Sequence, residues 1–145
     1  MKQKRQYAKI MISPKAERSV RNGHPWIYGE EILNIDGAPQ NGQLVDVFAG
    51  KAFMGTGFYN SASKITVRII SRNANDVFDA RFWRRRVEYA VRYRKTVMPS
   101  TDFTCCRLIH GEADQMPGLT VDRYGSILSV QITCLGMELV KDTVY

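Results

Sequence analysis

A cation, an imidazole and two larger aromatic rings stand within eight residues near the start of this chain. The segment reads Arg21-Asn-Gly-His-Pro-Trp-Ile-Tyr28. A guanidinium can hold a phosphate while planar rings stack on unpaired bases, so this mixture is typical of an RNA contact. Two structural interpretations stay open: Trp26 as a core anchor, and His24 as a turn residue placed before Pro25. Arg21, His24 and Trp26 are therefore candidate RNA-binding residues.

A dense run of cations forms the second candidate. Its members are Arg81, Arg84, Arg85, Arg86, Arg92, Arg94 and Lys95. On one helix they would form a surface that contacts phosphates, although such a run is also typical of a solvated helix face. Trp83 lies within the run and fits an apolar core better than a stacking platform. The residues that we predict to bind RNA here are Arg81, Arg84, Arg85 and Arg92.

Other residues with catalytic potential lack the partners that catalysis needs. Glu112, Asp114, Asp122 and His110 could suggest an acid–base pair or a metal site, but no second histidine stands at a metal-ligand spacing. Gly55-Thr-Gly57 lacks the third glycine of a nucleotide-binding loop and falls inside a predicted strand. The three cysteines form no CxxC motif and are predicted to be reduced thiols. We therefore predict no catalytic, cofactor-binding or metal-binding residue in this chain.

Composition and charge are those of a chain that folds. The 145 residues are 44% hydrophobic and 24% charged, which is enough for one ordinary domain or two small ones. The net charge is +7, with 18 basic against 8 acidic residues in 1–95 and 3 against 6 in 96–145. A basic front half favours nucleic acid as partner, although charge that merely maintains solubility is the alternative. Without a long apolar run or an apolar leader, the sequence predicts a cytoplasmic protein with no membrane partner.

The first seventy residues predict short strands and one helix. Ser13 is a suitable N-cap with Pro14 at the first helical position, and Asn22-Gly23 closes the helix. Alternating or β-branched segments predict strands over 7–12, 43–49, 52–59 and 65–70. Together these elements predict a small β-barrel or sandwich with one short helix.

The second half changes to a helical period. Asn75-Asp76 is a capping pair, and the helix predicted over 77–98 ends at Pro99. Its apolar stripe is predicted from Ala80, Trp83, Val87, Ala90, Val91 and Val97. Strands are predicted over 106–110, 119–122 and 126–132, and a last helix from about residue 135. The fold class predicted for the whole chain is α+β.

Two stretches carry a family resemblance. Arg21-x-Gly-His-Pro-Trp-x-Tyr28, with Phe58-Tyr-Asn-x-x-Ser63-x-Ile-x-Val-Arg68-Ile, resembles the PUA domain of RlmI-type 23S rRNA cytosine-5 methyltransferases. Arg107-Leu-Ile-His-Gly-Glu-Ala-Asp-x-x-Pro-Gly-Leu-Thr-Val-Asp-Arg-Tyr-Gly125 resembles the signature of the middle domain in that family. Phe82-Trp83-x-x-Arg86 lies between them in the expected order.

The resemblance implies a domain arrangement. Residues 1–72 would form a PUA-like β-barrel that binds RNA, and residues 73–145 a mixed strand-helix-strand domain of the EEHEE type, truncated at its end. The C-terminal Rossmann domain of the family would be absent.

The resemblance also implies an activity for a longer protein. Such enzymes transfer a methyl group from S-adenosylmethionine to C5 of a cytosine in ribosomal RNA, and the nucleophilic cysteine and cofactor pocket lie in the Rossmann domain. This chain would bind and position ribosomal RNA and need no cofactor itself, and DNA is not an expected partner. Two alternatives stay open: a stand-alone RNA-binding module, and a scaffold that docks an acidic protein. A homodimer through an exposed strand of the second domain stays open as well.

Overall fold

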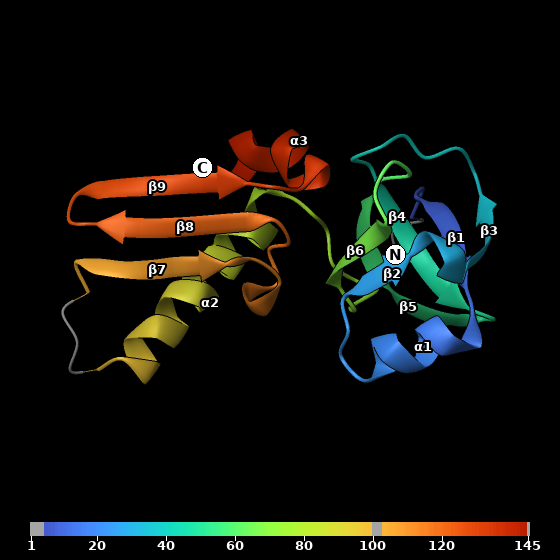
Figure 1. Ribbon diagram of the computed structural model, residues 1–145, viewed down its shortest axis with the longest axis horizontal. Helices are drawn as coiled ribbons and strands as arrows, with labels where there is room; N and C mark the ends of the chain where they lie inside the picture. The colour runs from blue at the N-terminus through green and yellow to red at the C-terminus, as the bar shows by residue number, and fades with distance from the viewer. Residues whose placement is uncertain (1–4, 100–102, 145) are drawn as a thin grey trace. The chain divides into compact units, whose positions relative to one another are not determined.

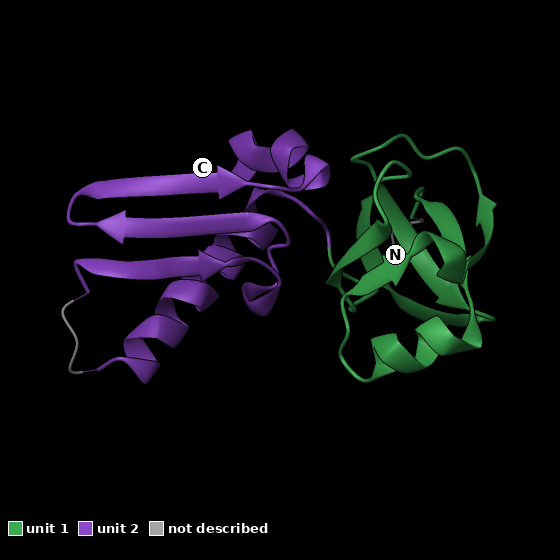
Figure 2. Cartoon of the chain, viewed as in Figure 1, with its two compact units in different colours: residues 1–76 green, residues 77–145 purple. Residues whose placement is uncertain are grey.

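The computed structural model describes residues 5–99 and 103–144. The chain divides into two compact units, residues 1–76 and residues 77–145 (Figure 2). Both units combine helices with a sheet whose strand pairs are antiparallel except for β1 with β4, which confirms the predicted α+β class. Within the described ranges, each helix is too short or too polar to cross a membrane.

The first unit is built on a six-stranded sheet that curls around its own core (Figure 1). Its strand order is β2-β6-β5-β4-β1-β3, and β1 runs parallel to β4 while the other neighbours are antiparallel. The strands are β1 (Ala8–Ile12), β2 (Trp26–Tyr28), β3 (Ile32–Asp36), β4 (Leu44–Ala49), β5 (Ala52–Tyr59) and β6 (Ile65–Ser71). The core holds fully buried Ile10, Ile27, Val45, Val47 and Val67.

Local sequence signals place the helix of this unit. In α1 (Pro14–Arg21), the Ser13 hydroxyl accepts a hydrogen bond from the Ala16 amide at 3.3 Å, as its N-cap position predicts. Ala16 and Val20 point into the core. The helix ends at Asn22, and Gly23 follows with φ +101°, a conformation that favours glycine.

Two strands were not predicted. The segments that form β2 and β3 are short, and β3 alternates weakly, with Leu33 67% exposed. Their strand character comes from long-range pairing, because β2 bonds to β6 and β3 bonds to β1. Within β5, glycine allows the backbones to approach closely, since a Cβ on Gly57 would lie 2.5 Å from the Arg68 carbonyl oxygen.

Residues 73–76 belong to the first unit, although the sequence placed them in the second domain. The Arg5 guanidinium donates to the Asp76 carbonyl at 2.7 Å, and the Ser71 hydroxyl donates to the Asp76 carboxylate at 2.6 Å. These contacts hold the segment against the sheet. They also occupy the carboxylate that was predicted to cap the following helix.

The second unit contains a three-stranded antiparallel sheet in the order β7-β8-β9. Its elements are α2 (Ala80–Val97), β7 (Cys105–His110), η2 (Gly111–Asp114), β8 (Leu119–Tyr124), β9 (Ile127–Ile132) and α3 (Leu135–Val144). Helix α2 lies across one face of the sheet (Figure 1). Its Phe82 and Trp83 are buried with Ile109, Leu119 and Met137.

Helix α2 begins three residues later than predicted. Its N-cap is Asp79, whose carboxylate accepts from the Phe82 amide at 3.0 Å, rather than the Asn75-Asp76 pair. The predicted apolar stripe is wrong at its two ends, because Ala80 and Val97 are exposed. Phe82 is buried instead and belongs to the stripe.

Candidate nucleic-acid interface

Three rings gather on the outer side of β2. Successive side chains of a strand point to opposite faces, so Ile27 enters the core while Trp26 and Tyr28 face outward. The His24 ring lies next to both: its centroid is 5.5 Å from that of Trp26, edge to face, and 6.5 Å from that of Tyr28, nearly parallel. All three residues are half-buried. We call His24, Trp26 and Tyr28 the aromatic row.

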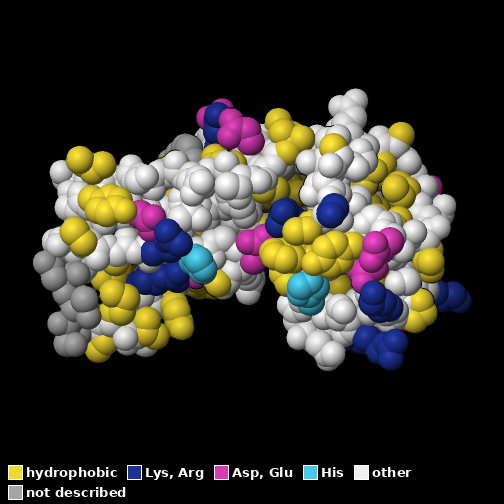
Figure 3. Space-filling view, in the orientation of Figure 1, with side chains coloured by type: hydrophobic (Ala, Val, Ile, Leu, Met, Phe, Trp, Pro, Cys, Tyr) yellow, Lys and Arg dark blue, Asp and Glu magenta, His cyan; other side chains and the backbone are white. Residues whose placement is uncertain are grey.

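Two arginines border the aromatic row. Trp26 stands opposite Arg68 on β6, and the Arg68 guanidinium carbon lies 5.5 Å from the Trp26 ring centroid, a cation–π distance. Arg72 donates to the His24 carbonyl at 3.4 Å. Figure 3 shows a histidine of the first unit beside a hydrophobic cluster, with cations nearby. The site therefore combines flat apolar surface with positive charge.

The residues on either side of the aromatic row determine the path of the backbone that carries it. Gly23 turns the chain out of α1, and Pro25 favours an extended conformation before β2. The Pro25 carbonyl accepts from the Ile69 amide at 2.8 Å, which joins the segment to β6. At the other end, the Glu31 carboxylate accepts from the Tyr28 amide at 3.0 Å. The rings are thus attached to a fixed backbone.

Sequence reasoning found part of this site. The structure brings His24 and Trp26 together, but Arg21 lies in the last turn of α1, where it pairs with Glu17 at 2.7 Å. The sequence did not predict Tyr28 and Arg68 as site residues, although both lie within the two motifs that carry the family resemblance. The pairing of β2 with β6 is what joins them to the site, and β2 was not predicted.

The second candidate surface is the exposed side of α2. Arg81, Arg84, Arg85 and Arg92 are all exposed, and their spacing places them on one side of the helix. The Arg85 guanidinium lies 5.6 Å from the Phe82 ring centroid, so its stem runs over apolar surface. We call these four arginines the basic face.

Two other arginines of the run do not belong to that exposed surface. Arg94 makes two bonds to the Asp114 carboxylate, at 2.5 and 2.6 Å, and both side chains are about nine-tenths buried. Arg86 is half-buried, with its guanidinium 4.9 Å from the Phe82 ring centroid. The broader basic surface that the sequence suggested is therefore wrong at these two positions.

Two of the three carboxylates that suggested a catalytic or metal site, Asp114 and Asp122, form ion pairs with arginines. Asp114, besides its pair with Arg94, accepts from the His110 amide at 2.6 Å. Asp122 accepts from Arg107 at 2.8 and 3.0 Å, and hydrogen bonding to that guanidinium lowers the pKa of Asp122. Across residues 5–99 and 103–144, no three histidines, cysteines or carboxylates are grouped as metal ligands.

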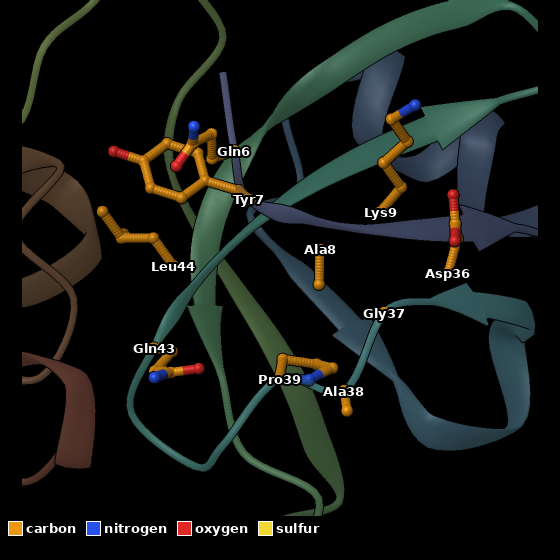
Figure 4. Close-up of a pocket in the computed structure, with 10 residues that line it drawn as sticks. All are labelled: Gln6, Tyr7, Ala8, Lys9, Asp36, Gly37, Ala38, Pro39, Gln43 and Leu44. Carbon is orange, nitrogen blue, oxygen red and sulfur yellow. The ribbon is translucent and has the colours of Figure 1, made fainter. Parts of the chain in front are cut away.

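A hollow of about 590 Å³ lies beside β1 and β3, at the other end of the strand order from β2 (Figure 4). Among its lining residues, Lys9 supplies the positive charge and Asp36 the negative charge. Burial raises the pKa of the Tyr7 phenol at its edge. The hollow offers one cation beside one carboxylate, which is a poor match to a phosphate chain.

The fold of the first unit defines its class: residues 10–72 match the family model of the PUA-like domain. Over 93% of its length, the chain is 36% identical to ribosomal RNA large subunit methyltransferase I of Shewanella denitrificans. Over 94%, it is 36% identical to the protein of that name from Shewanella frigidimarina and 31% identical to the one from Alteromonas mediterranea. The chain is thus related over nearly its whole length to RlmI-like methyltransferases, as the two sequence stretches predicted.

The chain spans about a third of these relatives, between 34% and 35% of their length. Among solved structures it is similar to a Streptococcus mutans protein classed as a SAM-dependent methyltransferase, and to a protein classed as a methyltransferase and solved with SAH. Both comparisons give a TM-score of 0.79 at 20% identity and cover 94% of this chain and 35% of the other. These comparisons show that this chain shares its fold with part of both structures.

Proposed function

We propose that this chain is the RNA-binding section of an rRNA methyltransferase and holds ribosomal RNA for catalysis that residues outside the chain perform. The observation that carries the proposal is the aromatic row with Arg68 beside it, on a PUA-like domain. The name shared by the curated relatives supports ribosomal RNA as the substrate.

The aromatic row would bind unpaired bases. A base has a flat π face that stacks on tryptophan, tyrosine or histidine whatever its identity, and a guanidinium nearby attracts the adjoining phosphate. Trp26 presents the largest ring of the row, and Arg68 stands directly across the strand pair. We therefore assign base stacking to Trp26 and phosphate attraction to Arg68.

The basic face of α2 would contribute phosphate contacts. Such contacts set the register and orientation of a nucleic acid without reading its sequence. Four exposed guanidinium groups on one helix side also make binding depend on salt, because each neutralised phosphate releases counterions. Arg81, Arg84, Arg85 and Arg92 would therefore position the RNA rather than select it.

Methyl transfer would take place in a longer protein in the cytoplasm. There S-adenosylmethionine would donate the methyl group and C5 of a cytosine would accept it. A neighbouring structure solved with SAH supports this cofactor. The turn from β1 into α1 does not fit it, because that turn is Ser13-Pro14 and is not a glycine-rich turn that opens a helix toward a nucleotide. The residues of this chain would bind and orient RNA only.

A titration of labelled RNA tests the proposal. A short single-stranded oligonucleotide, read by fluorescence anisotropy, should bind with an affinity that falls steeply as salt rises. Trp26→Ala should weaken binding about 5- to 100-fold, the loss of one stacked base, while Trp26→Phe should keep most of the affinity. Leu33→Ala is the matched control, since Leu33 is 67% exposed on β3 of the same unit. Equal affinity of Trp26→Ala and Leu33→Ala would contradict the assignment.

A second candidate is an RNA-binding module that acts without methyltransferase activity. It is favoured by the core of the first unit, whose buried residues all come from within that unit. The intact mass of the polypeptide that carries the Arg107–Gly125 segment in source cells distinguishes the two. A mass near 16.5 kDa supports the module, and a mass about three times larger supports the methyltransferase.

A further inference from the structure

The exposed side of α2 carries aromatic rings as well as cations. Tyr89 is 53% exposed, Tyr93 is 60% exposed, and Val97 one turn further along is also exposed. These residues follow one another at intervals of four, so they form one ridge along the helix. A single exposed apolar side chain is ordinary, but a ridge of three makes a continuous apolar strip. We call Tyr89 and Tyr93 the tyrosine row.

The tyrosine row continues the basic face. Arg81 and Arg85 occupy the two preceding positions of the same four-residue spacing. Arg92 follows Tyr89 by three residues, and its guanidinium carbon lies 5.9 Å from the Tyr89 ring centroid. Along α2 seven arginine and lysine residues accompany one carboxylate, Glu88. The rings and the cations therefore share one surface, whose charge suits a phosphate-bearing partner.

The two rings stand as separate platforms. The Arg94 guanidinium carbon lies 5.5 Å from the Tyr93 ring centroid, and Arg94 is itself fixed by two bonds to the Asp114 carboxylate. Tyr93 thus has a fixed cation beside it while most of the residue stays open to solvent. Four residues of α-helix rise by roughly 6 Å, so Tyr89 and Tyr93 are far enough apart for each to take its own base.

We infer that α2 binds an unpaired RNA strand, with one base stacked on Tyr89, another on Tyr93, and phosphates attracted by Arg85 and Arg92. The inference rests on the proposed function and adds to it the class of RNA that this helix accepts. Bases within a duplex are covered by their neighbours, whereas unpaired bases can stack on aromatic side chains. An acidic protein would match the cations but would bring no bases to the two rings.

Anisotropy titrations of the full chain with labelled single-stranded and duplex RNA of equal length test the inference. Tyr89→Ala and Tyr93→Ala should each weaken single-strand binding about 5- to 100-fold, the loss of one stacked base, and leave duplex binding unchanged. Phenylalanine at either position should keep most of the affinity. Tyr124→Ala is the matched control, because Tyr124 is 57% exposed in the same unit and alternation along β8 puts it on the sheet face opposite buried Val121.

Salt dependence separates stacking from charge. Arg85→Gln and Arg92→Gln should each lower the slope of log affinity against log salt by about 0.7, the value for one phosphate contact on a single strand. The tyrosine variants should lose affinity at an unchanged slope, because a phenol neutralises no phosphate. Equal slope changes in both sets of variants overturn the assignment of base stacking to Tyr89 and Tyr93.

The same titrations in parent and Trp26→Ala backgrounds distinguish this inference from the proposed function. If the tyrosine variants match Tyr124→Ala in both backgrounds, the inference is overturned, and a loss caused by Trp26→Ala still supports the proposed function. Equal losses for duplex RNA also overturn the inference, as does displacement of the RNA by polyglutamate with the same dependence on the tyrosines. A parent chain that binds neither RNA overturns both. Protection of the β8 amides from hydrogen exchange verifies that each variant is folded.

Discussion

Arg5 is expected to contribute more to the stability of the first unit than any single surface ion pair. Its guanidinium donates to the Asp46 carboxylate at 2.9 Å, to the Thr56 hydroxyl at 2.6 Å and to the Asp76 carbonyl at 2.7 Å. The group therefore ties the start of the chain to β4, to β5 and to the segment that follows β6. Arg5→Ala removes all three connections at once.

The size of the effect follows from what the substitution leaves behind. The Asp46 side chain is 6% exposed, and without Arg5 its carboxylate keeps the hydrogen bond from the Thr56 hydroxyl at 2.6 Å. Removing one partner of a fully buried ion pair costs about 3–5 kcal/mol. Because the Arg5 side chain is 19% exposed and water can partly replace it, we expect about 2–3 kcal/mol.

Urea unfolding of the whole chain, followed through the NMR amide signals of Val45 and Val47 in β4, reports on this unit. Arg21→Ala is the control, since it breaks the exposed pair with Glu17 in the same unit and should cost less than about 0.5 kcal/mol. If Arg5→Ala costs no more than Arg21→Ala, the argument for a buried, shared guanidinium is refuted.

Two further predictions concern the second unit. Arg94→Ala should lower the free energy of unfolding of this unit by about 3 kcal/mol, because the buried Asp114 carboxylate loses a partner that makes two hydrogen bonds to it. Urea unfolding followed through the NMR signals of the β8 amides measures the change, and a loss below about 1 kcal/mol would contradict the prediction. The hydrogen bond from Arg107 lowers the pKa of Asp122, so this pair stabilises the folded unit at any pH above the pKa of an ordinary carboxyl group. The stabilisation is lost as the pH falls through the pKa that Asp122 has in the folded state. Acid titration of Asp122→Asn should therefore show a shallower loss of stability than the parent, and identical slopes would count against it.

The sequence predicted most elements because their signals are local. Ser13 with Pro14 marks the start of α1, and the β-branched run in β6 marks a strand. The signals that failed depend on distant partners. β2 has three residues, and its pairing with β6 makes it a strand. Asp76 was predicted to cap a helix, but its carboxylate accepts from the Ser71 hydroxyl and its carbonyl accepts from the Arg5 guanidinium.

The candidate site divides in the same way. Helical spacing alone placed Arg81, Arg85 and Arg92 on one side of α2. The burial of Arg94 could not be read from that spacing, because its partner Asp114 lies beyond β7. Likewise, Arg68 lies beside Trp26 because β2 pairs with β6, and more than half of the sequence of the first unit separates these two residues. Local patterns identified residue types, and long-range pairing decided which of them meet.

The strand orders of the two sheets also determine how quickly each unit can form. In the second unit, β7, β8 and β9 follow one another along the chain, so short loops bring each pair together. In the first unit, the paired residues lie far apart in the sequence: Ala8 pairs with Val45, and Trp26 pairs with Arg68. Closing long loops before contacts form slows folding. The part of the chain synthesised first should therefore be the last to reach its native state, and the time needed to close its sheet should set when the aromatic row is ready.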